Sequence, residues 1–455
     1  MSNSGLGSLA AIAAVLGGVW RGKDRQAGAV TTDTRSLKPG DIFLALCGER
    51  FDAHDFLAQA REAGAVAAIV SRPVDDRLPQ IQVTDTRLAL GILGQARRLA
   101  WGGPLVAVTG NSGKTTVKEM VAAILRRRGE TLATKGNLNN DIGAPLTLLG
   151  LSPAHRHAVI ELGANHLGEI AWTTMLARPQ VAVITNVTGA HVGEFGGMGQ
   201  IAQAKGEILA GLASDGVAVL NRDDVFYPFW QRLAGQRCVL DFGLSADARI
   251  QARDMVNDEV GRYAFTLVQD GKPLGRVLLG LFGKHNVRNA LAAAAAALAL
   301  EVPAEDVIAA LSELQAMPGR LAMVEGLRGS RLLDDTYNAN PGAVKAALDV
   351  LAQMPAPRWC FLGAMGELGE AAGSLHAEVG HYARERGIDF LGTLGPLAEP
   401  AARAFGEPGC HFTNWDALLR HAQNHLPSGA SVLVKGSRSA GMERLVAELR
   451  ADASR

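Results

Sequence analysis

Short apolar runs alternate with amphipathic segments along most of the chain, a pattern typical of α/β proteins. Between residues 105 and 317 the pattern predicts a doubly wound, mostly parallel sheet with helices on both faces. The expected strands are Leu105–Val108, Ala158–Ile160, Val181–Ile184 and Val217–Leu220, and the expected helices are Thr116–Leu125, Leu167–Ala177, Ile201–Leu212 and Asn286–Leu300. Residues 247–283 lack the helical period, so we expect antiparallel strands there.

The same alternation continues on both sides of this central part and predicts three α/β domains. The first part should hold strands at 41–46, 66–70 and 81–84 with helices at 56–63 and 87–100, while the last part should hold strands at 359–362, 390–394 and 432–434. Gly and Pro residues near 101–104 and 317–320 mark the boundaries. We therefore expect a small α/β domain at 1–101, a central domain at 102–317, and a Rossmann-like α/β domain at 318–455.

Composition narrows the class of protein. The chain has 455 residues, of which 48% are hydrophobic and 20% charged, and its formal net charge is +0. A neutral chain has no basic field for nucleic acid or an anionic membrane, so neither partner is expected. The four cysteines are far apart and include no C-x-x-C pair, which favours reduced thiols. Residues 6–20 have the spacing of an amphipathic helix capped by Ser8, and no basic residue precedes them, so a signal peptide is not expected. No run of eighteen apolar residues occurs without a charge or a glycine, so we expect a cytoplasmic protein with no membrane span, and we also expect a monomer.

A phosphate-binding loop is predicted between the first central strand and its helix. Gly110 and Gly113 let the backbone curl so that main-chain N–H groups face an anion, and the next helix adds its positive end. Lys114 would reach the outer phosphates, and the Thr115 hydroxyl would bind Mg²⁺. The usual motif has a glycine five residues before Gly113, where this chain has Val108. The shorter pattern still predicts nucleotide binding, because strand and helix both flank it.

Other polar residues follow the neighbouring strands, where ligands of such sheets bind. Glu161 comes directly after its predicted strand and is a candidate for metal or water binding beside a triphosphate. His191 lies in a glycine-rich loop, where a lone histidine is usually just polar. Lys205 would by default be a solvated helix lysine. Residue chemistry alone therefore selects Glu161 and leaves the other two open.

An ordered set of motifs over residues 30–445 resembles the Mur ligases of peptidoglycan synthesis. The motifs are T-D-T-R-S-L-K-P-G-D, T-G-N-S-G-K-T-T-V-K-E, K-G-N-L-N-N-D, E-L-G-A-N-H, T-N-V-T-G-A-H, A-K-G-E-I, G-K-H-N-V-R-N-A, P-G-R, D-D-T-Y-N-A-N-P, G-E-L-G and K-G-S-R. Three of them, E-L-G-A-N-H, Y-N-A-N-P and G-E-L-G, are similar to the family members that add D-alanyl-D-alanine. The resemblance implies a three-domain, ATP- and Mg²⁺-dependent amide ligase that acts on UDP-N-acetylmuramoyl-tripeptide through an acyl phosphate.

The resemblance also implies roles for individual residues. It gives catalytic roles to Lys114, His191 and Lys205, the last as a lysine carbamylated by CO₂. It places metal ligands at Thr115, Glu161, His191 and Lys205, ATP contacts at Gly110, Asn111, Ser112, Gly113, Lys114, Thr115, Thr116, Asn289, Arg320 and Asp335, and sugar-peptide contacts at Arg35, Ser36, Asn139 and Asn140. Related ligases carry a lysine two residues beyond the aspartate, where this chain has Tyr337.

Two other functions remain open at this point. A ligase of the same superfamily could add a single amino acid, or glutamate to a folate, although a folate enzyme would not need the motifs at 31–56. A nucleotide-binding switch without ligase chemistry would account for the phosphate loop. It would not account for Glu161, His191 and Lys205 occurring together.

Overall fold

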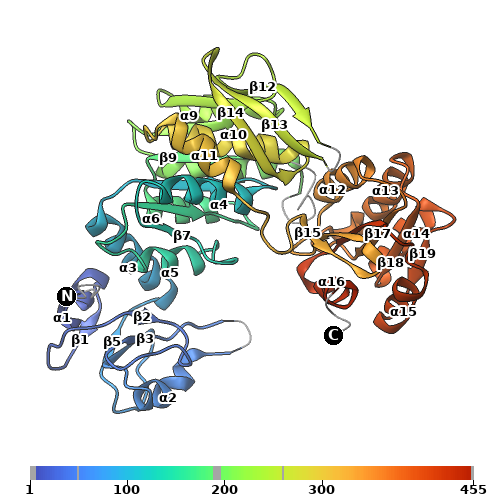
Figure 1. Cartoon of the computed structure of the whole chain (residues 1–455). Helices are drawn as coiled ribbons and strands as arrows, with labels where there is room; N and C mark the ends of the chain where they lie inside the picture. Colours follow the sequence, from blue (N-terminus) through green and yellow to red (C-terminus); the bar gives the residue numbers. More distant parts are fainter. Residues whose placement is uncertain (1–6, 49–50, 188–195, 259–260, 452–455) are drawn as a thin grey trace.

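The computed structural model describes residues 7–48, 51–187, 196–258 and 261–451, and it contains three separate β-sheets (Figure 1). Figure 1 shows the domain with the largest sheet between the other two, with the first domain in blue and the last in orange and red. The expected three-domain α/β architecture is confirmed. No helix in the described ranges is long and apolar enough to cross a membrane.

The N-terminal domain is a five-stranded sheet in the order β1-β5-β4-β3-β2, parallel except for β1. Its elements are α1 (Leu9–Leu16), β1 (Val19–Trp20), β2 (Val30–Thr31), β3 (Ile42–Leu44), η1 (Ala53–Phe56), α2 (Leu57–Glu62), β4 (Ala67–Val70), β5 (Gln80–Gln82) and α3 (Thr86–Trp101). The helix expected at 6–20 is shorter. Gly17 ends it in the left-handed conformation at φ 60°, and the chain then turns into β1 beside β5.

The central domain holds nine strands in the order β14-β13-β12-β11-β10-β9-β6-β8-β7. Its strands are β6 (Leu105–Thr109), β7 (Thr131–Ala133), β8 (His157–Glu161), β9 (Val181–Ile184), β10 (Val217–Asn221), β11 (Cys238–Gly243), β12 (Ile250–Asn257), β13 (Arg262–Gln269) and β14 (Lys272–Phe282). Its helices are α4 (Lys114–Arg126), α5 (Gly143–Leu149), α6 (Glu169–Ala177), α8 (Met198–Gly206), η2 (Glu207–Gly211), α9 (Tyr227–Ala234), α10 (Lys284–Leu298) and α11 (Ala304–Glu313). The strands from β7 to β12 are parallel, and β12, β13 and β14 form the antiparallel part predicted from residues 247–283.

Both faces of the parallel sheet are buried, which explains its unbroken apolar runs. Val106 and Val108 pack with α4 and α10 on one face, whereas Leu105 and Ala107 pack with α5, α6 and α8 on the other. Each alanine between residues 290 and 297 of α10 is at most 1% exposed. Small side chains let this helix lie close to the sheet, as the smooth alanine face predicts.

The helix predicted at 201–212 is split, because α8 ends at Gly206 and a 3-10 turn, η2, follows. This turn packs closely against α6, where a Cβ on Gly211 would lie 2.2 Å from the Thr174 carbonyl oxygen. The Glu207 carboxylate accepts hydrogen bonds from the N–H groups of Gly168 (2.7 Å) and Ala171 (3.1 Å) at the start of α6. Tertiary contact therefore fixes the tighter turn.

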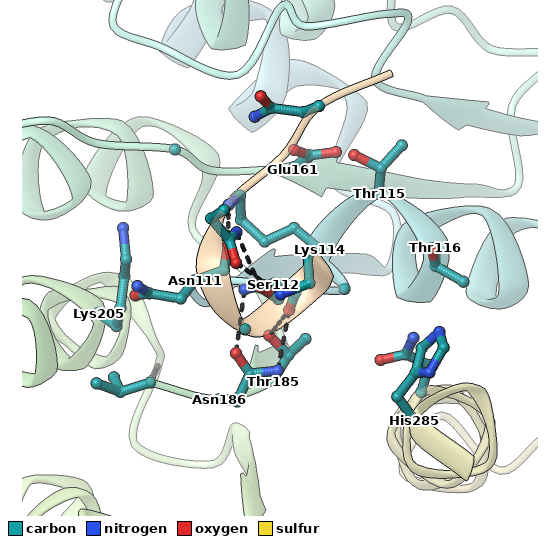
Figure 2. Close-up of a pocket in the computed structure, with 18 of the residues that line it drawn as sticks. Asn111, Ser112, Lys114, Thr115, Thr116, Glu161, Thr185, Asn186, Lys205 and His285 are labelled. Carbon is teal, nitrogen blue, oxygen red and sulfur yellow. Dashed lines mark hydrogen bonds between the residues drawn. The ribbon is translucent and has the colours of Figure 1, made fainter. Parts of the chain in front are cut away.

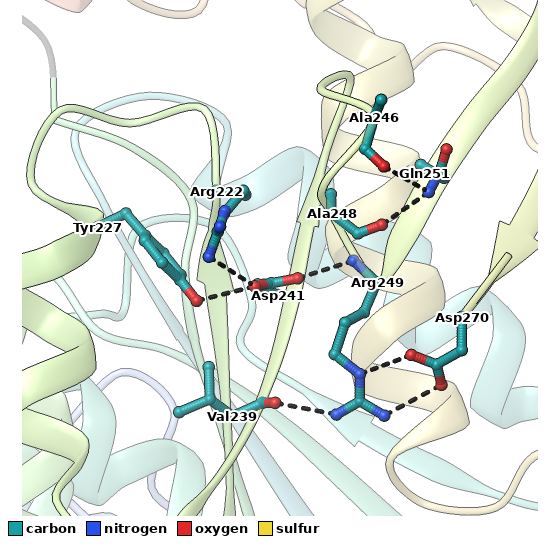
Figure 3. Close-up of polar contacts among 9 residues, drawn as sticks. All are labelled: Arg222, Tyr227, Val239, Asp241, Ala246, Ala248, Arg249, Gln251 and Asp270. Atoms are coloured by element: carbon teal, nitrogen blue, oxygen red, sulfur yellow. Dashed lines mark hydrogen bonds and ion pairs between the residues drawn. The ribbon is translucent and has the colours of Figure 1, made fainter.

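A buried aspartate fastens the antiparallel strands to the parallel sheet (Figure 3). Asp241 on β11 is 5% exposed and accepts hydrogen bonds from the Tyr227 hydroxyl (2.8 Å) and the Arg249 main-chain N–H (2.8 Å). The Arg249 side chain then forms a two-pronged ion pair with Asp270, at 2.7 and 3.0 Å. These contacts join α9, β11 and the β12–β13 hairpin into one unit.

The C-terminal domain is a six-stranded sheet in the order β15-β16-β20-β17-β18-β19, parallel except for β15. Its elements are β15 (Ala322–Glu325), η3 (Leu327–Gly329), β16 (Arg331–Asp335), α12 (Pro341–Gln353), β17 (Arg358–Gly363), η4 (Gly369–Ala371), α13 (Ala372–Glu385), β18 (Phe390–Leu394), η5 (Pro396–Ala398), α14 (Glu399–Phe405), β19 (Cys410–Phe412), α15 (Trp415–His425), β20 (Ser431–Lys435), η6 (Arg438–Ala440) and α16 (Glu443–Leu449). Asn340 caps α12, its side-chain oxygen accepting from the Ala343 N–H at 2.8 Å, and Pro341 follows as first helical residue.

The two outer domains are attached to the central domain in different ways. Helix α3 lies against α5 and α6, and Gly91 and Gly94 allow contact with Trp172 and Pro145. Arg98, only 4% exposed, donates to the carbonyl oxygen of Ala177 at 2.7 Å. The C-terminal domain is instead joined to the central domain through the chain segment 317–321.

Candidate active site

A polar cleft of about 1010 Å³ lies where the central and C-terminal domains meet. Its lining includes most of the predicted site residues: Asn111, Ser112, Gly113, Lys114, Thr115, Thr116, Asn139, Asn140, Glu161, Lys205, Asn289, Arg320 and Asp335. Figure 2 shows the phosphate loop in the middle of this cleft, with Lys205 and His285 on opposite sides of it. The carboxyl ends of β6, β8 and β9 face the cleft, as expected for this type of sheet.

The phosphate loop has the backbone conformation that its glycines predict. Gly110 has φ 143° and Gly113 has φ 81°, both in the region that favours glycine. A Cβ on Gly110 would lie 1.9 Å from the Thr185 hydroxyl oxygen, and one on Gly113 would lie 2.5 Å from the Asn289 side-chain oxygen. Both the conformation and the space therefore require glycine at these two positions.

Asn186, two residues after β9, holds the phosphate loop through three hydrogen bonds. Its side chain accepts from the Ser112 N–H at 3.0 Å and donates to the Ser112 carbonyl oxygen at 3.1 Å, while its own carbonyl accepts from the Asn111 N–H at 2.9 Å. The Thr185 hydroxyl also donates to the Ser112 carbonyl at 2.6 Å. Two loop N–H groups are thus already bonded, so a phosphate would use those at the start of α4, which have no acceptor within the helix.

Lys114 folds back over the loop. Its ammonium donates to the carbonyl oxygens of Gly110 (2.9 Å) and Asn111 (3.2 Å). Desolvation lowers the pKa of Lys114, the nearby Glu161 carboxylate opposes that shift, and Arg320 adds to it. The ammonium is therefore placed at the loop, close to where an outer phosphate would lie.

Glu161 is the last residue of β8 and is 2% exposed. One carboxylate oxygen, Oε1, accepts from the Asn139 side-chain amide at 2.8 Å. The other, Oε2, is buried and has no hydrogen-bond partner among the residues that the structure describes. Figure 2 shows the Glu161 carboxylate and the Thr115 hydroxyl pointing toward one another. An unsatisfied carboxylate oxygen beside a hydroxyl fits Mg²⁺, which prefers oxygen ligands.

Lys205 on α8 is buried, with 3% of its surface exposed, although residue chemistry alone suggests a solvated lysine. Desolvation, followed by the charge of Lys114, lowers its pKa to about 7. His191, the other residue predicted beside the metal, lies outside the described residues. Within those residues, no group of three or more His, Cys, Asp or Glu side chains could hold a metal ion.

Polar residues of helix α10 line the cleft on the side of the phosphate loop opposite Lys205. Asn289 donates to the Asn286 side-chain oxygen at 2.9 Å, and Asn286 donates to the Phe282 carbonyl at 2.8 Å. Desolvation lowers the pKa of His285 to about 4, with Asp335 opposing the shift. A neutral imidazole and two amides beside a triphosphate site suit a nucleobase.

The C-terminal domain contributes a cation and an ion pair. The Arg320 guanidinium lies over the Tyr337 ring, 4.2 Å from its centre, and the Tyr337 N–H donates to the Gly319 carbonyl at 3.0 Å. Asp335 forms an ion pair with the buried Lys435. Asn340 donates to the Ser112 hydroxyl at 3.4 Å, which joins this domain directly to the phosphate loop.

The sugar-peptide residues predicted by resemblance lie in two places. Asn139 and Asn140 line the cleft, and the Asn140 side chain accepts from the N–H of Gly143, the first residue of α5, at 2.8 Å. Arg35 and Ser36 are not part of the cleft lining. Arg35 forms an ion pair with Asp33 at 2.7 Å on the surface of the N-terminal domain, and the Ser36 hydroxyl lies 3.1 Å from that of Thr31.

Several cleft residues were not predicted as site residues: Arg87, Asp141, Asn186, His285, Tyr337, Glu367 and Lys435. Lys435 is the last residue of a parallel strand, and Asn186 lies two residues after one, which is the signal that could have found them. Arg87 comes from α3 and pairs with Asp141 at 2.9 Å. No sequence signal marks that contact between domains.

Comparisons with known proteins agree with this geometry. Three family profiles match in order: "Mur ligase family, catalytic domain" at residues 26–98, "Mur ligase middle domain" at 108–297, and "Mur ligase, glutamate ligase domain" at 319–438. The chain is 45% identical over 446 residues to the UDP-N-acetylmuramoyl-tripeptide–D-alanyl-D-alanine ligase of Escherichia coli strain K12, covering 97% of this chain and 98% of that protein.

Two solved structures are similar over most of their length. The crystal structure of MurF from Acinetobacter baumannii has a TM-score of 0.91 at 38% identity, covering 97% of this chain and 98% of that one. The MurF ligase from Thermotoga maritima in complex with ADP has a TM-score of 0.82 at 29% identity, covering 92% and 96%.

Proposed function

The chain belongs to the Mur ligase family, and from this we propose that it is an ATP-dependent amide ligase that joins D-alanyl-D-alanine to UDP-N-acetylmuramoyl-tripeptide. One observation carries the proposal: the interdomain cleft brings a phosphate loop, a buried carboxylate and a buried lysine together. We further propose domain limits of 1–101, 102–317 and 318–455, and a monomer that acts in the cytoplasm on peptidoglycan precursors.

The first step joins two anionic groups. The carboxylate oxygen of the tripeptide attacks the γ-phosphorus of ATP, a C–O–P linkage forms, and the bond from that phosphorus to ADP breaks. Lys114 and the N–H groups at the start of α4 stabilise the negative charge on the transferred phosphoryl group. Mg²⁺, which Thr115 and Glu161 would hold, supplies further positive charge against the repulsion between the two anions.

The second step forms the amide. The amine of D-alanyl-D-alanine attacks the acyl carbon, a C–N bond forms, the C–O bond to phosphate breaks, and the amine loses its proton. Water would destroy the acyl phosphate, so the site should close first. Arg320 lines the cleft from the hinge and Asp335 lines it from the C-terminal domain, so both would face the nucleotide, and Asn340 already contacts Ser112. Closure about 317–321 would therefore complete the site.

The remaining roles follow the family pattern. We propose that Asn289 contacts the adenine, that Asn139 and Asn140 contact the sugar-peptide, and that Arg35 and Ser36 hold its uridine end. We propose that a carbamylated Lys205 supports a second Mg²⁺ together with His191. The burial of Lys205 in the cleft wall supports the first part of this assignment.

Phosphate release with defined acceptors tests the function. We expect release from ATP to require both UDP-N-acetylmuramoyl-tripeptide and an acceptor, with D-alanyl-D-alanine far better than D-alanine or L-amino acids. Preference for a single amino acid would move the chain to another ligase of the superfamily. ATP turnover that does not respond to either substrate would favour a nucleotide-dependent switch.

Replacing the loop lysine tests the proposed chemistry. We expect Lys114→Ala to lower phosphate release by about a hundredfold to a thousandfold, since an aligned charge-stabilising group contributes that much to such reactions. An unchanged thermal midpoint would show that the fold survives. Activity within threefold of the unsubstituted protein would contradict the assigned role.

A further inference from the structure

A second lysine on the phosphate-loop helix is buried more deeply than the first. Lys118 lies one helical turn after Lys114 and is 1% exposed. It does not line the cleft, so it has no direct part in the chemistry above. A buried ammonium is costly unless it is fully paired, which makes its partners informative.

The Lys118 ammonium has two partners. It forms an ion pair with the neighbouring Glu119, and it donates to the Thr134 carbonyl oxygen at 2.8 Å. Thr134 directly follows β7 and is 1% exposed. The lysine therefore fixes the end of β7 to the underside of α4.

Thr134 passes this constraint on to the metal-binding strand. Its hydroxyl oxygen accepts from the Glu161 main-chain N–H at 3.0 Å, and its own N–H donates to the Val159 carbonyl at 3.1 Å. Glu161 is the residue whose buried Oε2 has no hydrogen-bond partner in the described part of the chain. A continuous set of contacts thus runs from Lys118 through Thr134 to Glu161.

We propose that Lys118 is a positioning residue for the metal site: through Thr134 it fixes the backbone of Glu161 and so aims Oε2 toward the phosphate loop. The inference rests on the proposed function, because it assumes that Glu161 binds the metal ion. A carboxylate that must meet a cation within a few tenths of an ångström needs such support behind it, and outer contacts of this kind set metal affinity.

Variants of Thr134 test this with little change in shape. Thr134→Val removes the hydroxyl that accepts from Glu161, and Thr134→Ser keeps it. Thr131→Val is the matched control, because its hydroxyl bonds the Gly129 carbonyl (3.0 Å) at the other end of the same strand. The readout is the dissociation constant of Mn²⁺, used in place of Mg²⁺ and measured by electron paramagnetic resonance with the β,γ-methylene analogue of ATP.

We expect Thr134→Val to weaken Mn²⁺ binding about tenfold or more, as loss of an outer contact commonly does. Thr134→Ser and Thr131→Val should stay within twofold of the unsubstituted protein. Lys118→Met, which keeps the length of the side chain, should weaken Mn²⁺ binding as well. Its effect should not add to that of Thr134→Val in the double variant, because both act through one set of contacts.

Four results would overturn the inference. They are Mn²⁺ affinity within twofold of normal in folded Lys118→Met, the same in folded Thr134→Val, an equal loss in Thr131→Val, and fully additive losses in the double variant. If Lys118→Met does not fold, the Thr134 series decides the question alone. Failure of the unsubstituted protein to bind Mn²⁺ with the ATP analogue would instead remove the proposed function, and the inference with it.

Discussion

Replacing Asn186 should disturb the order of the phosphate loop, and so ATP binding, more than it disturbs the stability of the whole protein. Asn186→Ala removes two side-chain hydrogen bonds to Ser112, of 3.0 and 3.1 Å, and leaves the main-chain bond to Asn111 in place. Each such bond contributes about 0.5–1.5 kcal/mol net, so about 1–3 kcal/mol is lost. The loop must be ordered before it can bind phosphate, so this loss should weaken ATP binding by about 5-fold to 150-fold.

Calorimetric titration with the ATP analogue measures the effect directly. Asn186→Asp is the informative companion, because it keeps the acceptor for the Ser112 N–H but places a negative charge beside the triphosphate; we expect it to bind more weakly than Asn186→Ala. Thr174→Val is the control, since it removes a buried hydroxyl bonded to the Ile208 carbonyl (3.0 Å) away from the cleft. It should lower the thermal midpoint and leave affinity unchanged. ATP affinity within twofold of normal in Asn186→Ala would refute this account of the loop.

Three further predictions follow from contacts around the cleft. Gly110→Ala should abolish nucleotide binding, because its Cβ would lie 1.9 Å from the Thr185 hydroxyl; binding within tenfold of normal in a titration would contradict this. Tyr337→Ala should raise the KM for ATP by about 2-fold to 30-fold by releasing Arg320, whereas Tyr337→Phe keeps the ring and should not; equal KM values for both variants would rule the contact out. The pKa of His285 is lowered to about 4, so on acidification the unfolded chain binds a proton before the folded chain does, and stability should fall as the pH drops from 6.5 toward 4. His285→Gln should make the thermal midpoint less dependent on pH over that window, and an unaltered slope of the midpoint against pH would exclude His285 as the cause.

Much of the fold is predictable because apolar residues repeat with a different period in strands and in helices. The strand expected at 181–184 coincides with β9, and those expected at 158–160 and 217–220 each lie within a slightly longer strand. The differences have two causes. The close approach of Gly211 to α6 tightens residues 207–211 into a 3-10 turn, and this long-range contact cannot be read from the spacing of apolar residues. At α1 the cause is local, because Gly17 takes the left-handed conformation and ends the helix before residue 20.

The site divides in a similar way. Gly110, Gly113 and Lys114 were predictable from local physics, because their chemistry depends on one strand, one turn and one helix. Lys205 was not, since its burial depends on packing between distant segments. Pairing of Lys435 with Asp335 joins strands a hundred residues apart in the sequence. This ion pair becomes visible only in the structure, where β16 and β20 are neighbouring strands.

The attachment of the first domain has a consequence for substrate length. Helix α3 packs against α5 and α6 of the central domain, and Arg98 donates to the carbonyl oxygen of Ala177, so the first domain is attached to the central domain by a packed and hydrogen-bonded contact. If the uridine end is held on one domain and the triphosphate on the other, this contact sets the distance between the two sites. An extended peptide residue spans about 3.3–3.6 Å, so a dipeptide precursor would stop short of the reacting phosphorus by that length. Fixed spacing, rather than contact with each side chain, would then count the residues of the growing chain.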